Sequence, residues 1–150
     1  MSPWAALLLG ELLSPQGAGW YQTQLSGSVS SGVRGEHLEL GGELLVSGDR
    51  DRSRLLSTGQ LHLRLAALPG VHFDAEPWSL GLGLGPSLGL RLVRWREPVE
   101  LLAPIWEPGL RVAATLLCGT GPWAFELRTG AGFRAGGGDV DLGLGVHRRW

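Results

Sequence analysis

Leucine alternates with small residues through the stretch WSLGLGLGPSLGLRLVRW, which runs from Trp78 to Trp95. The residues of one parity include a row of leucines: Leu80, Leu82, Leu84, Leu88, Leu90 and Leu92. The residues of the other parity are mostly glycine or serine: Ser79, Gly81, Gly83, Gly85, Ser87, Gly89 and Arg91. A period of two places successive side chains on opposite faces of a β-strand. The stretch therefore predicts a long strand with one apolar face and one nearly bare face.

The same alternation recurs along the rest of the chain and is interrupted by short polar turns. It predicts strands at about residues 4–13, 20–31, 37–46, 55–67, 78–95, 110–118, 123–134 and 140–150, with residues 69–77 as a connection. Consecutive antiparallel strands with short turns close as an up-and-down barrel. We therefore expect an all-β chain, in which residues 1–150 form a single domain, an eight-stranded antiparallel transmembrane β-barrel.

Composition excludes several other classes. A chain of 150 residues has the size of one domain, and its net charge of −1 provides no basic field for nucleic acid. The single cysteine, Cys118, excludes an internal disulfide and a multi-cysteine metal site. The sequence contains no apolar run of about 18 residues, so it offers no transmembrane helix. We interpret the opening MSPWAALLLGELL as a first strand rather than a signal peptide, with a signal remnant as the alternative.

The face that points inward decides between two kinds of barrel. A soluble lipocalin-like barrel would bury the leucine face around an apolar ligand, whereas a membrane barrel would turn that face to lipid. The opposite face carries Gly, Ser, Gln and sparse charges, rather than the Lys, Glu and Thr of a solvated surface. Glycine weakens a soluble sheet but makes room inside a narrow lumen. The pattern favours the membrane barrel, and the soluble carrier remains the alternative.

The tryptophans are predicted to mark two membrane interfaces. In the barrel, the predicted strand ends put four of them at one rim: Trp4, Trp78, Trp123 and Trp150. Three others fall toward the opposite rim: Trp20, Trp95 and Trp106. Tryptophan prefers the membrane–water interface because its ring is apolar and its N–H needs a partner. We therefore expect a girdle of indoles at each rim.

On these features the chain resembles the small bacterial outer-membrane β-barrels of the OmpA and OmpX architecture. In that family the last strand ends in an aromatic residue after alternating apolar residues, and the assembly machinery reads this signal. The matching residues here are Val140, Leu142, Leu144, Val146 and Trp150. An outward Arg148, and Trp in place of the usual Phe, depart from the pattern. The resemblance implies location in the outer membrane with periplasmic termini, and as partners a lipid bilayer and the barrel assembly machinery. We expect a monomer.

The predicted lumen collects charged residues of both signs. The expected network comprises Glu39, Glu43, Arg64, Arg91, Arg111, Glu126, Arg128, Asp141 and Arg149, accompanied by His37, His62 and His147. An unpaired charge away from water is costly, so these groups should pair across the lumen. Eight strands also leave little free bore. We therefore expect a plugged, non-enzymatic barrel that forms at most a small pore.

A catalytic interpretation is the alternative from another class, because some family members modify lipids. A serine, a histidine and an acid near one rim would suit acyl-ester hydrolysis, and His147 with Asp141 or Ser79 is the candidate set. The His-x-Ser pairing of the lipid A deacylase-like barrels and a G-x-S-x-G motif are missing. The histidines lack metal-ligand spacing, so no metal or cofactor is expected.

The stretch from Trp78 to Trp95 is longer than a membrane requires. Its 18 residues extend over about 60 Å, whereas a transmembrane strand needs only about 9–11 residues. A turn near Glu97 and Pro98 would pair Trp78 with Leu116 and Leu84 with Leu110. We expect a hairpin that projects away from the termini, with Pro104 and Pro108 loosening its returning strand. A tight turn at residues 85–87, which would give ten strands, is the alternative.

Overall fold

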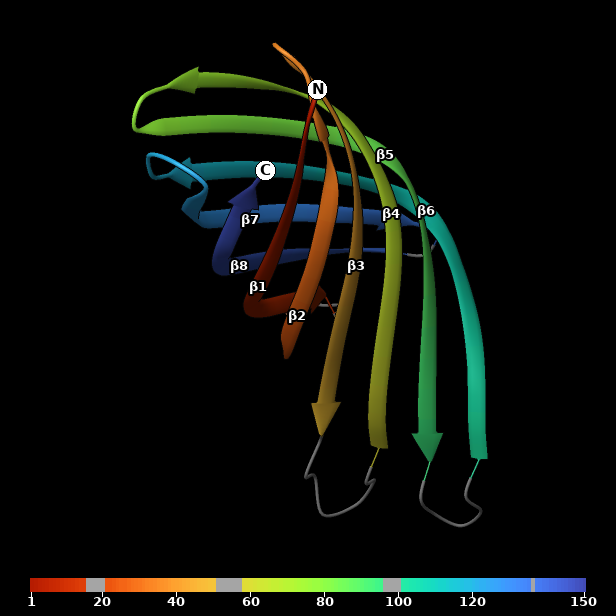
Figure 1. The fold of residues 1–150 in the computed structure, drawn as a ribbon. Helices are drawn as coiled ribbons and strands as arrows, with labels where there is room; N and C mark the ends of the chain where they lie inside the picture. The colour runs from red at the N-terminus through yellow and green to blue at the C-terminus, as the bar shows by residue number, and fades with distance from the viewer. Residues whose placement is uncertain (16–20, 51–57, 96–100, 136) are drawn as a thin grey trace.

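The chain forms a single closed β-sheet in a computed structural model that describes residues 1–15, 21–50, 58–95, 101–135 and 137–150 (Figure 1). Its eight strands are β1 (Ser2–Pro15), β2 (Tyr21–Arg34), β3 (Leu38–Arg50), β4 (Thr58–Ala75), β5 (Trp78–Trp95), β6 (Leu101–Cys118), β7 (Trp123–Arg134) and β8 (Gly137–Arg149). Each strand pairs antiparallel with its neighbours in sequence, and β1 pairs with β8. The predicted eight-stranded up-and-down barrel is therefore confirmed.

No helix in the described part of the chain is long and apolar enough to cross a membrane.

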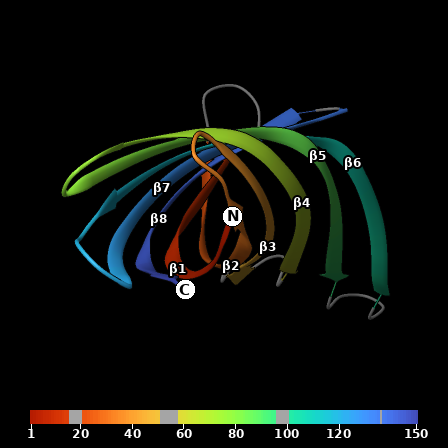
Figure 2. The ribbon, with the colours of Figure 1, turned by 45° about the horizontal axis from the view of Figure 1, so that its top comes forward.

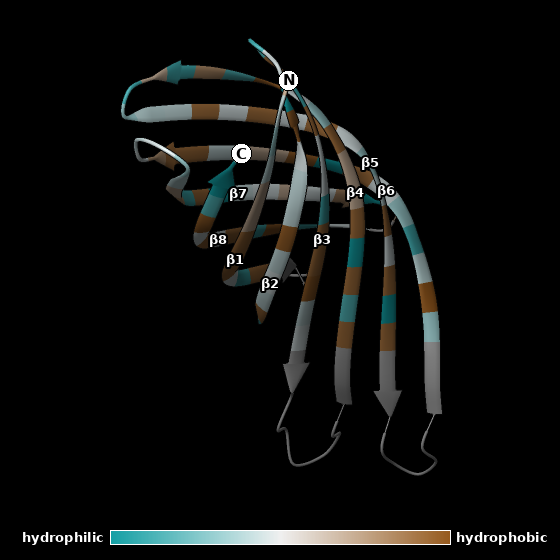
Figure 3. Cartoon of the chain, in the orientation of Figure 1, coloured by the Kyte–Doolittle hydropathy of each residue, from teal (hydrophilic) through white to brown (hydrophobic). Residues whose placement is uncertain are grey.

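The leucine face lies on the outside of the barrel. Leu82 and Leu84 are 47% and 57% exposed, whereas Gly81 and Gly85, which flank them along the strand, are buried. Figure 3 shows the same alternation of hydrophobic and hydrophilic residues along most strands. Because the apolar side chains point outward, the interior formed by the described residues has no large apolar cavity for a carried ligand, and its cavities measure only about 10–30 Å³. The lipocalin-like alternative is therefore wrong for this fold.

The barrel closes along a seam between its first and last strands. The seam pairs Trp4 with Arg149 at one end and Leu13 with Val140 at the other. The Trp150 amide also donates to the Pro3 carbonyl at 3.1 Å. Both ends of the chain therefore lie at the same rim, as Figure 2 shows.

Strand β4 is longer than predicted. It continues past residue 67 to Ala75, and the segment expected as a connection belongs to the strand. Its pairing with β5 lapses between Ala66↔Ser87 and Gly70↔Gly83, and resumes in the same register. Pro69 and Pro86 lie in this gap, where a residue without an N–H cannot complete the ladder. Because the register is unchanged, the inward and outward faces are the same on both sides of the gap.

Strand β5 is continuous from Trp78 to Trp95, so Leu84 and Leu88 lie on one strand and the ten-strand alternative is wrong. The register with β6 differs from the prediction by two residues, because Trp78 pairs with Cys118 and Leu84 with Val112. An even shift leaves every side chain on its predicted face. The turn used for that prediction lies outside the described residues.

Four strands continue beyond the closed part of the barrel. The last β6–β7 pair is Gly109↔Arg134, so the preceding part of β6 pairs only with β5. Figure 1 shows β3, β4, β5 and β6 continuing together past the rest of the barrel, and we call this part the arm. Pro104 and Pro108 keep their β5 partners, so the prediction that they loosen the strand is wrong. They lie along the free edge, where proline is tolerated and discourages pairing with another chain.

Candidate functional site

The candidate site is the charged interior of the barrel, and the glycines of the inward face make room for it. A Cβ atom on Gly130 would lie 2.3 Å from Nη1 of Arg111, and one on Gly132 would lie 2.6 Å from Nη1 of Arg64. Real side chains do not approach so closely, so these two positions are occupied in effect by guanidinium groups. The bare face of the strands therefore lets arginines from other strands cross the lumen.

Arg111 holds the centre of the lumen and has none of its surface exposed. Its Nε donates to Oε2 of Glu43 at 3.1 Å, and its Nη2 donates to Oδ1 of Asp141 at 2.9 Å. These contacts connect β6 with β3 on one side and with β8 on the other. A buried guanidinium between two carboxylates, with several donors satisfied, is a strong and geometrically specific arrangement.

A second cluster lies toward the rim of the termini. Nδ1 of His147 lies 3.0 Å from Oε2 of Glu126, and Nη2 of Arg128 lies 2.5 Å from the other oxygen of that carboxylate. The indole of Trp4 stacks on His147, with ring centroids 5.0 Å apart. Trp4 is only 5% exposed, so its prediction as a girdle residue is wrong. It packs inside the barrel with Ala6 and Leu8.

A third cluster lies toward the arm. Asp139 accepts from both Arg64 and Arg134. Glu107 lies 2.8 Å from Nη2 of Arg91, 3.3 Å from Nε of Arg134 and 3.6 Å from Nε2 of His62. Each of these two carboxylates thus has more than one cationic or imidazole neighbour, so the cluster joins β4, β5, β6, β7 and β8.

The mouth at the rim of the termini carries the last cluster. Arg34 donates to Glu39 at 2.7 and 2.9 Å and lies 3.9 Å from Asp74, which is 3.4 Å from the ring of His72. Arg149 points inward at this mouth, and among the described residues its buried Nε has no hydrogen-bond partner.

The structure brings most of the predicted network together, but several of the partners are new. Of the nine predicted residues, only Arg149 forms no ion pair with the described residues. The eight that do are Glu39, Glu43, Arg64, Arg91, Arg111, Glu126, Arg128 and Asp141. The partners that the sequence reasoning missed are Arg34, Asp74, Glu107, Arg134 and Asp139. Glu107 and Asp139 share parity with Arg111 and Asp141, and this signal could have identified them. His37 lies exposed in the turn between β2 and β3 rather than in the lumen, which holds His72 instead.

The catalytic set considered from the sequence does not assemble. Asp141 pairs with Arg111, and Ser79 lies at the mouth, 3.4 Å from Nη1 of Arg34. His147 pairs instead with Glu126, and its Nε2 is buried without a hydrogen-bond partner among the described residues. An imidazole oriented by a carboxylate but without a hydroxyl neighbour lacks a nucleophile to activate.

The space left in the lumen is small and divided. A cavity of about 30 Å³ lies beside Trp4, Ser30 and Arg128, and two of about 10 Å³ lie beside Arg64 and beside Asp141. The cavity of about 30 Å³ has room for one or two water molecules, and each of the smaller cavities for one at most. No group of three or more His, Cys, Asp or Glu suited to a metal ion occurs in the described part of the chain.

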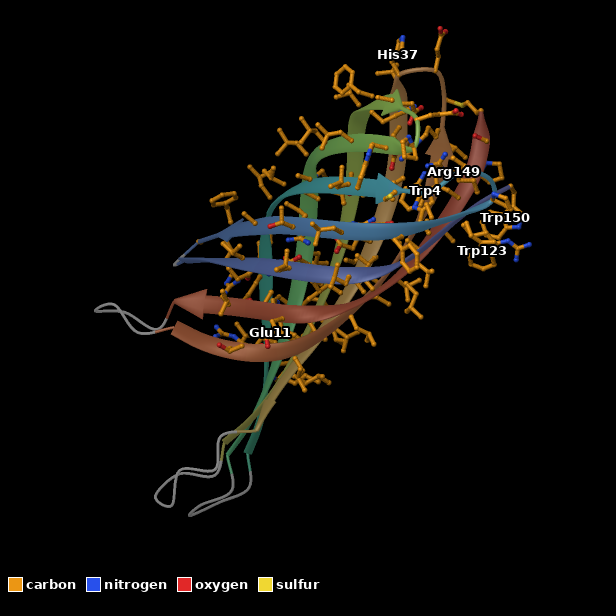
Figure 4. The ribbon with its side chains drawn as sticks, turned by 90° about the vertical axis from the view of Figure 1, so that its left-hand side faces the viewer. Trp4, Glu11, His37, Trp123, Arg149 and Trp150 are labelled. Carbon is orange, nitrogen blue, oxygen red and sulfur yellow. The ribbon has the colours of Figure 1, made fainter. Side chains whose placement is uncertain are left out.

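The outer wall carries aromatic side chains at its rims. Trp78, Trp123 and Trp150 are about half exposed, and Figure 4 shows Trp123 and Trp150 projecting together at the rim of the termini. Trp106 is 63% exposed near the base of the arm. Trp20 lies outside the described residues, as does the side chain of Trp95. The outward row of β8 contains exposed side chains: Val140, Leu142, Leu144, Val146 and, just past its end, Trp150.

The same architecture occurs in solved structures of outer-membrane proteins. The attachment invasion locus protein Ail of Yersinia pestis is 12% identical, covers 99% of this chain and 98% of its own, and has a TM-score of 0.76. Neisserial surface protein A is 14% identical, covers 99% and 97%, and has a TM-score of 0.76. The outer membrane enzyme PagL is 12% identical, covers 97% and 98%, and has a TM-score of 0.57. No protein-family model and no curated protein matches the sequence.

The fold is therefore that of the small bacterial outer-membrane β-barrels. At identities of 12–14% the likeness extends to the fold alone. The fold does not by itself distinguish an enzyme from a protein without catalytic activity, because PagL is an enzyme with this architecture.

Proposed function

We propose that the chain is an integral protein of the bacterial outer membrane, with a plugged lumen and a structural or adhesive role at the cell surface. The observation that carries the proposal is the reversed polarity of the barrel. Leucines cover the outer wall, whereas Arg111 is completely buried between Glu43 and Asp141. Such a wall is unfavourable in water but suits a bilayer, whose hydrocarbon core accepts apolar side chains and excludes charge.

The proposed partners follow from the same surfaces. A lipid bilayer surrounds the leucine wall, and the monomer needs no second copy because one chain closes its own barrel. The outward row of β8, with Trp150 after it, is the proposed signal for the barrel assembly machinery. Both termini then face the periplasm, and the arm projects from the cell.

The arm is the proposed site of adhesion. Ail, whose name denotes attachment, has also been solved with the heparin analogue sucrose octasulfate. In this chain the exposed side chains of Ile105 and Trp106 lie on the part of β6 that has no β7 partner. We propose a non-enzymatic role because Nε2 of His147 has no hydroxyl hydrogen-bonded to it among the described residues, and because the lumenal cavities there are smaller than a substrate.

Folding and topology test the proposal. The purified chain should fold only in detergent or lipid and migrate differently on an unboiled denaturing gel than after boiling. A peptide tag placed between β5 and β6 should be reached by antibody on intact cells, whereas the same tag in the turn at Gly35–His37 should not. In planar bilayers the conductance should be small or absent.

Three outcomes would contradict parts of this function. A stable monomer in buffer without detergent or lipid would contradict the proposed location in the membrane. An accessible tag at the β2–β3 turn with a protected tag at the arm would reverse the orientation. A stable, porin-sized conductance would exclude the plugged lumen.

A further inference from the structure

Arg148 is an outward-facing cation at the rim of the termini. Its guanidinium carbon lies 5.2 Å from the ring centroid of Trp123 and 4.9 Å from that of Trp150. Two indole rings therefore hold the cation by cation–π contacts. None of the carboxylates that the structure describes forms an ion pair with it. The hydrogen-bond donors of this guanidinium remain available to an external anion.

An apolar groove begins next to this cation. The outward pair Trp123↔Arg148 is followed along β7 and β8 by the outward pair Phe125↔Val146. The groove has a volume of about 520 Å³, within the range of roughly 300–1,000 Å³ typical of small-molecule sites. Its walls include Trp78, Leu116, Phe125, Leu127, Leu144 and Val146. Charge and apolar surface thus follow one another along a single face of the wall.

We propose that this face binds one anionic phospholipid, with the phosphate on Arg148 and an acyl chain in the groove. The inference rests on the proposed function, because the wall faces lipid only in an inserted barrel. The order of features matches the ligand, since a phospholipid presents its charge at the interface and its chain below it. Arginine suits phosphate because its planar fork donates two parallel hydrogen bonds. Indoles also prefer the depth of the headgroups.

The experiment compares lipids and two neighbouring arginines. The barrel is folded in a mild detergent, and bound lipid is counted by native mass spectrometry. Phosphatidylglycerol and phosphatidylcholine with identical chains are offered in equal amounts. The folded protein should retain one phosphatidylglycerol in preference to phosphatidylcholine. Arg148→Gln should weaken this preference about fivefold, which corresponds to about 1 kcal/mol for one basic residue near a membrane surface.

Arg149→Gln is the matched control. It removes the same charge one residue further along β8, but that side chain points into the barrel. It should leave the lipid preference unchanged. Leu144→Trp, which fills the groove, should reduce retention of both lipids, and soluble glycerol phosphate should not displace the bound lipid. The difference between boiled and unboiled samples on a gel establishes that each variant is folded.

The outcomes separate the site from the function on which it rests. Equal losses in the two arginine variants would overturn the site in favour of a bulk charge effect. Displacement by glycerol phosphate, or unchanged retention in Leu144→Trp, would overturn the acyl-chain groove. A barrel that inserts into bilayers but shows no lipid preference would overturn the site and leave the proposed function standing. A chain that does not insert would overturn both.

Discussion

The indole of Trp4 and the imidazole of His147 stack inside the barrel with an angle of 18° between their planes. The stack joins β1 to β8, the two strands that close the sheet. Trp4 therefore stabilises the interior. Trp123 begins β7, the other strand that pairs with β8, and its side chain points outward.

We expect Trp4→Ala to lower the free energy of unfolding by about 3–5 kcal/mol, the usual cost of removing a buried large aromatic side chain. Trp123→Ala should cost clearly less, because its side chain is half exposed. Urea unfolding of the protein in phospholipid vesicles measures both. Equal losses of unfolding free energy in the two variants would contradict the buried position of Trp4 and would favour its prediction as a girdle residue.

Removal of the central cation should destabilise the barrel strongly. Arg111→Met leaves the buried Asp141 without its cation and leaves Glu43 with Arg128 alone, 3.8 Å away. Breaking a buried pair in this way costs about 3–5 kcal/mol. Adding Glu43→Gln and Asp141→Asn to the same protein should recover part of the loss. Unfolding in vesicles provides the comparison. If the triple variant is no more stable than Arg111→Met, the pairing is not the source of the effect.

Adjacent positions on β5 should respond differently to polar substitution. Leu82→Arg places a cation on the lipid-facing wall and should cost about 2–4 kcal/mol if the position is near the bilayer midplane. Gly83→Ser should be mild, because a Cβ there would lie 3.4 Å from its nearest neighbour, the Cβ of Leu68. The fraction of folded protein on an unboiled gel reports both. The opposite order would reverse the assignment of faces.

Two inward glycines should differ in their tolerance of a methyl group. A Cβ on Gly145 would lie 1.9 Å from the Leu7 carbonyl oxygen across the seam, whereas the nearest neighbour of one on Gly81 would be 3.6 Å away. Gly145→Ala must push β1 and β8 apart and should cost about 1–3 kcal/mol, as overpacking does. Gly81→Ala should be nearly neutral. Comparable unfolding curves for the two variants would show that the seam can relax.

Glu11 is an acid on the apolar outer wall. It is exposed on β1, where it pairs with Leu25 of β2 and with Leu142 of β8. Glu11 is labelled in Figure 4. Carboxylates on a lipid-facing strand are unfavourable, although less so than arginine at the midplane. Glu11→Leu should therefore raise the free energy of unfolding at neutral pH by about 1 kcal/mol. Unfolding in vesicles measures it, with Leu9→Glu as the opposite change. A loss of stability in Glu11→Leu would point to a polar partner on this wall.

The alternation of the sequence was sufficient to predict the number of strands, and the faces of those strands in which only one parity is apolar. A period of two follows from backbone geometry, so it identifies β5 and its outward leucines without knowledge of any neighbour. The same pattern could not orient β1, because both parities of that strand are apolar, with Leu8 and Leu12 inside and Leu7 and Leu9 outside. Its facing is determined by pairing with β8, which a local pattern does not contain.

Pairing across the lumen was the part that the sequence could not provide. Parity assigns Arg64 and Arg111 to the interior, but not which carboxylate each one meets. Arg64 meets Asp139, which the predicted strand omitted because it began one residue later. Glu107 was missed for a similar reason, since β6 begins at Leu101 and the prediction began at residue 110. Strand ends depend on partners in the sheet, and these are non-local.

The seam also determines the order in which the barrel can be made. Trp4 and Arg149 are neighbours in space but lie almost the whole chain apart. Until the last strand arrives, β1 carries a free edge of N–H and C=O groups that hydrocarbon cannot satisfy. Contacts between such distant residues also form slowly, because a long loop must close first. The nascent chain therefore cannot enter a bilayer strand by strand as it is synthesised. It closes in one late event, and any factor that accelerates this event has to shield the edges of β1 and β8 until they meet.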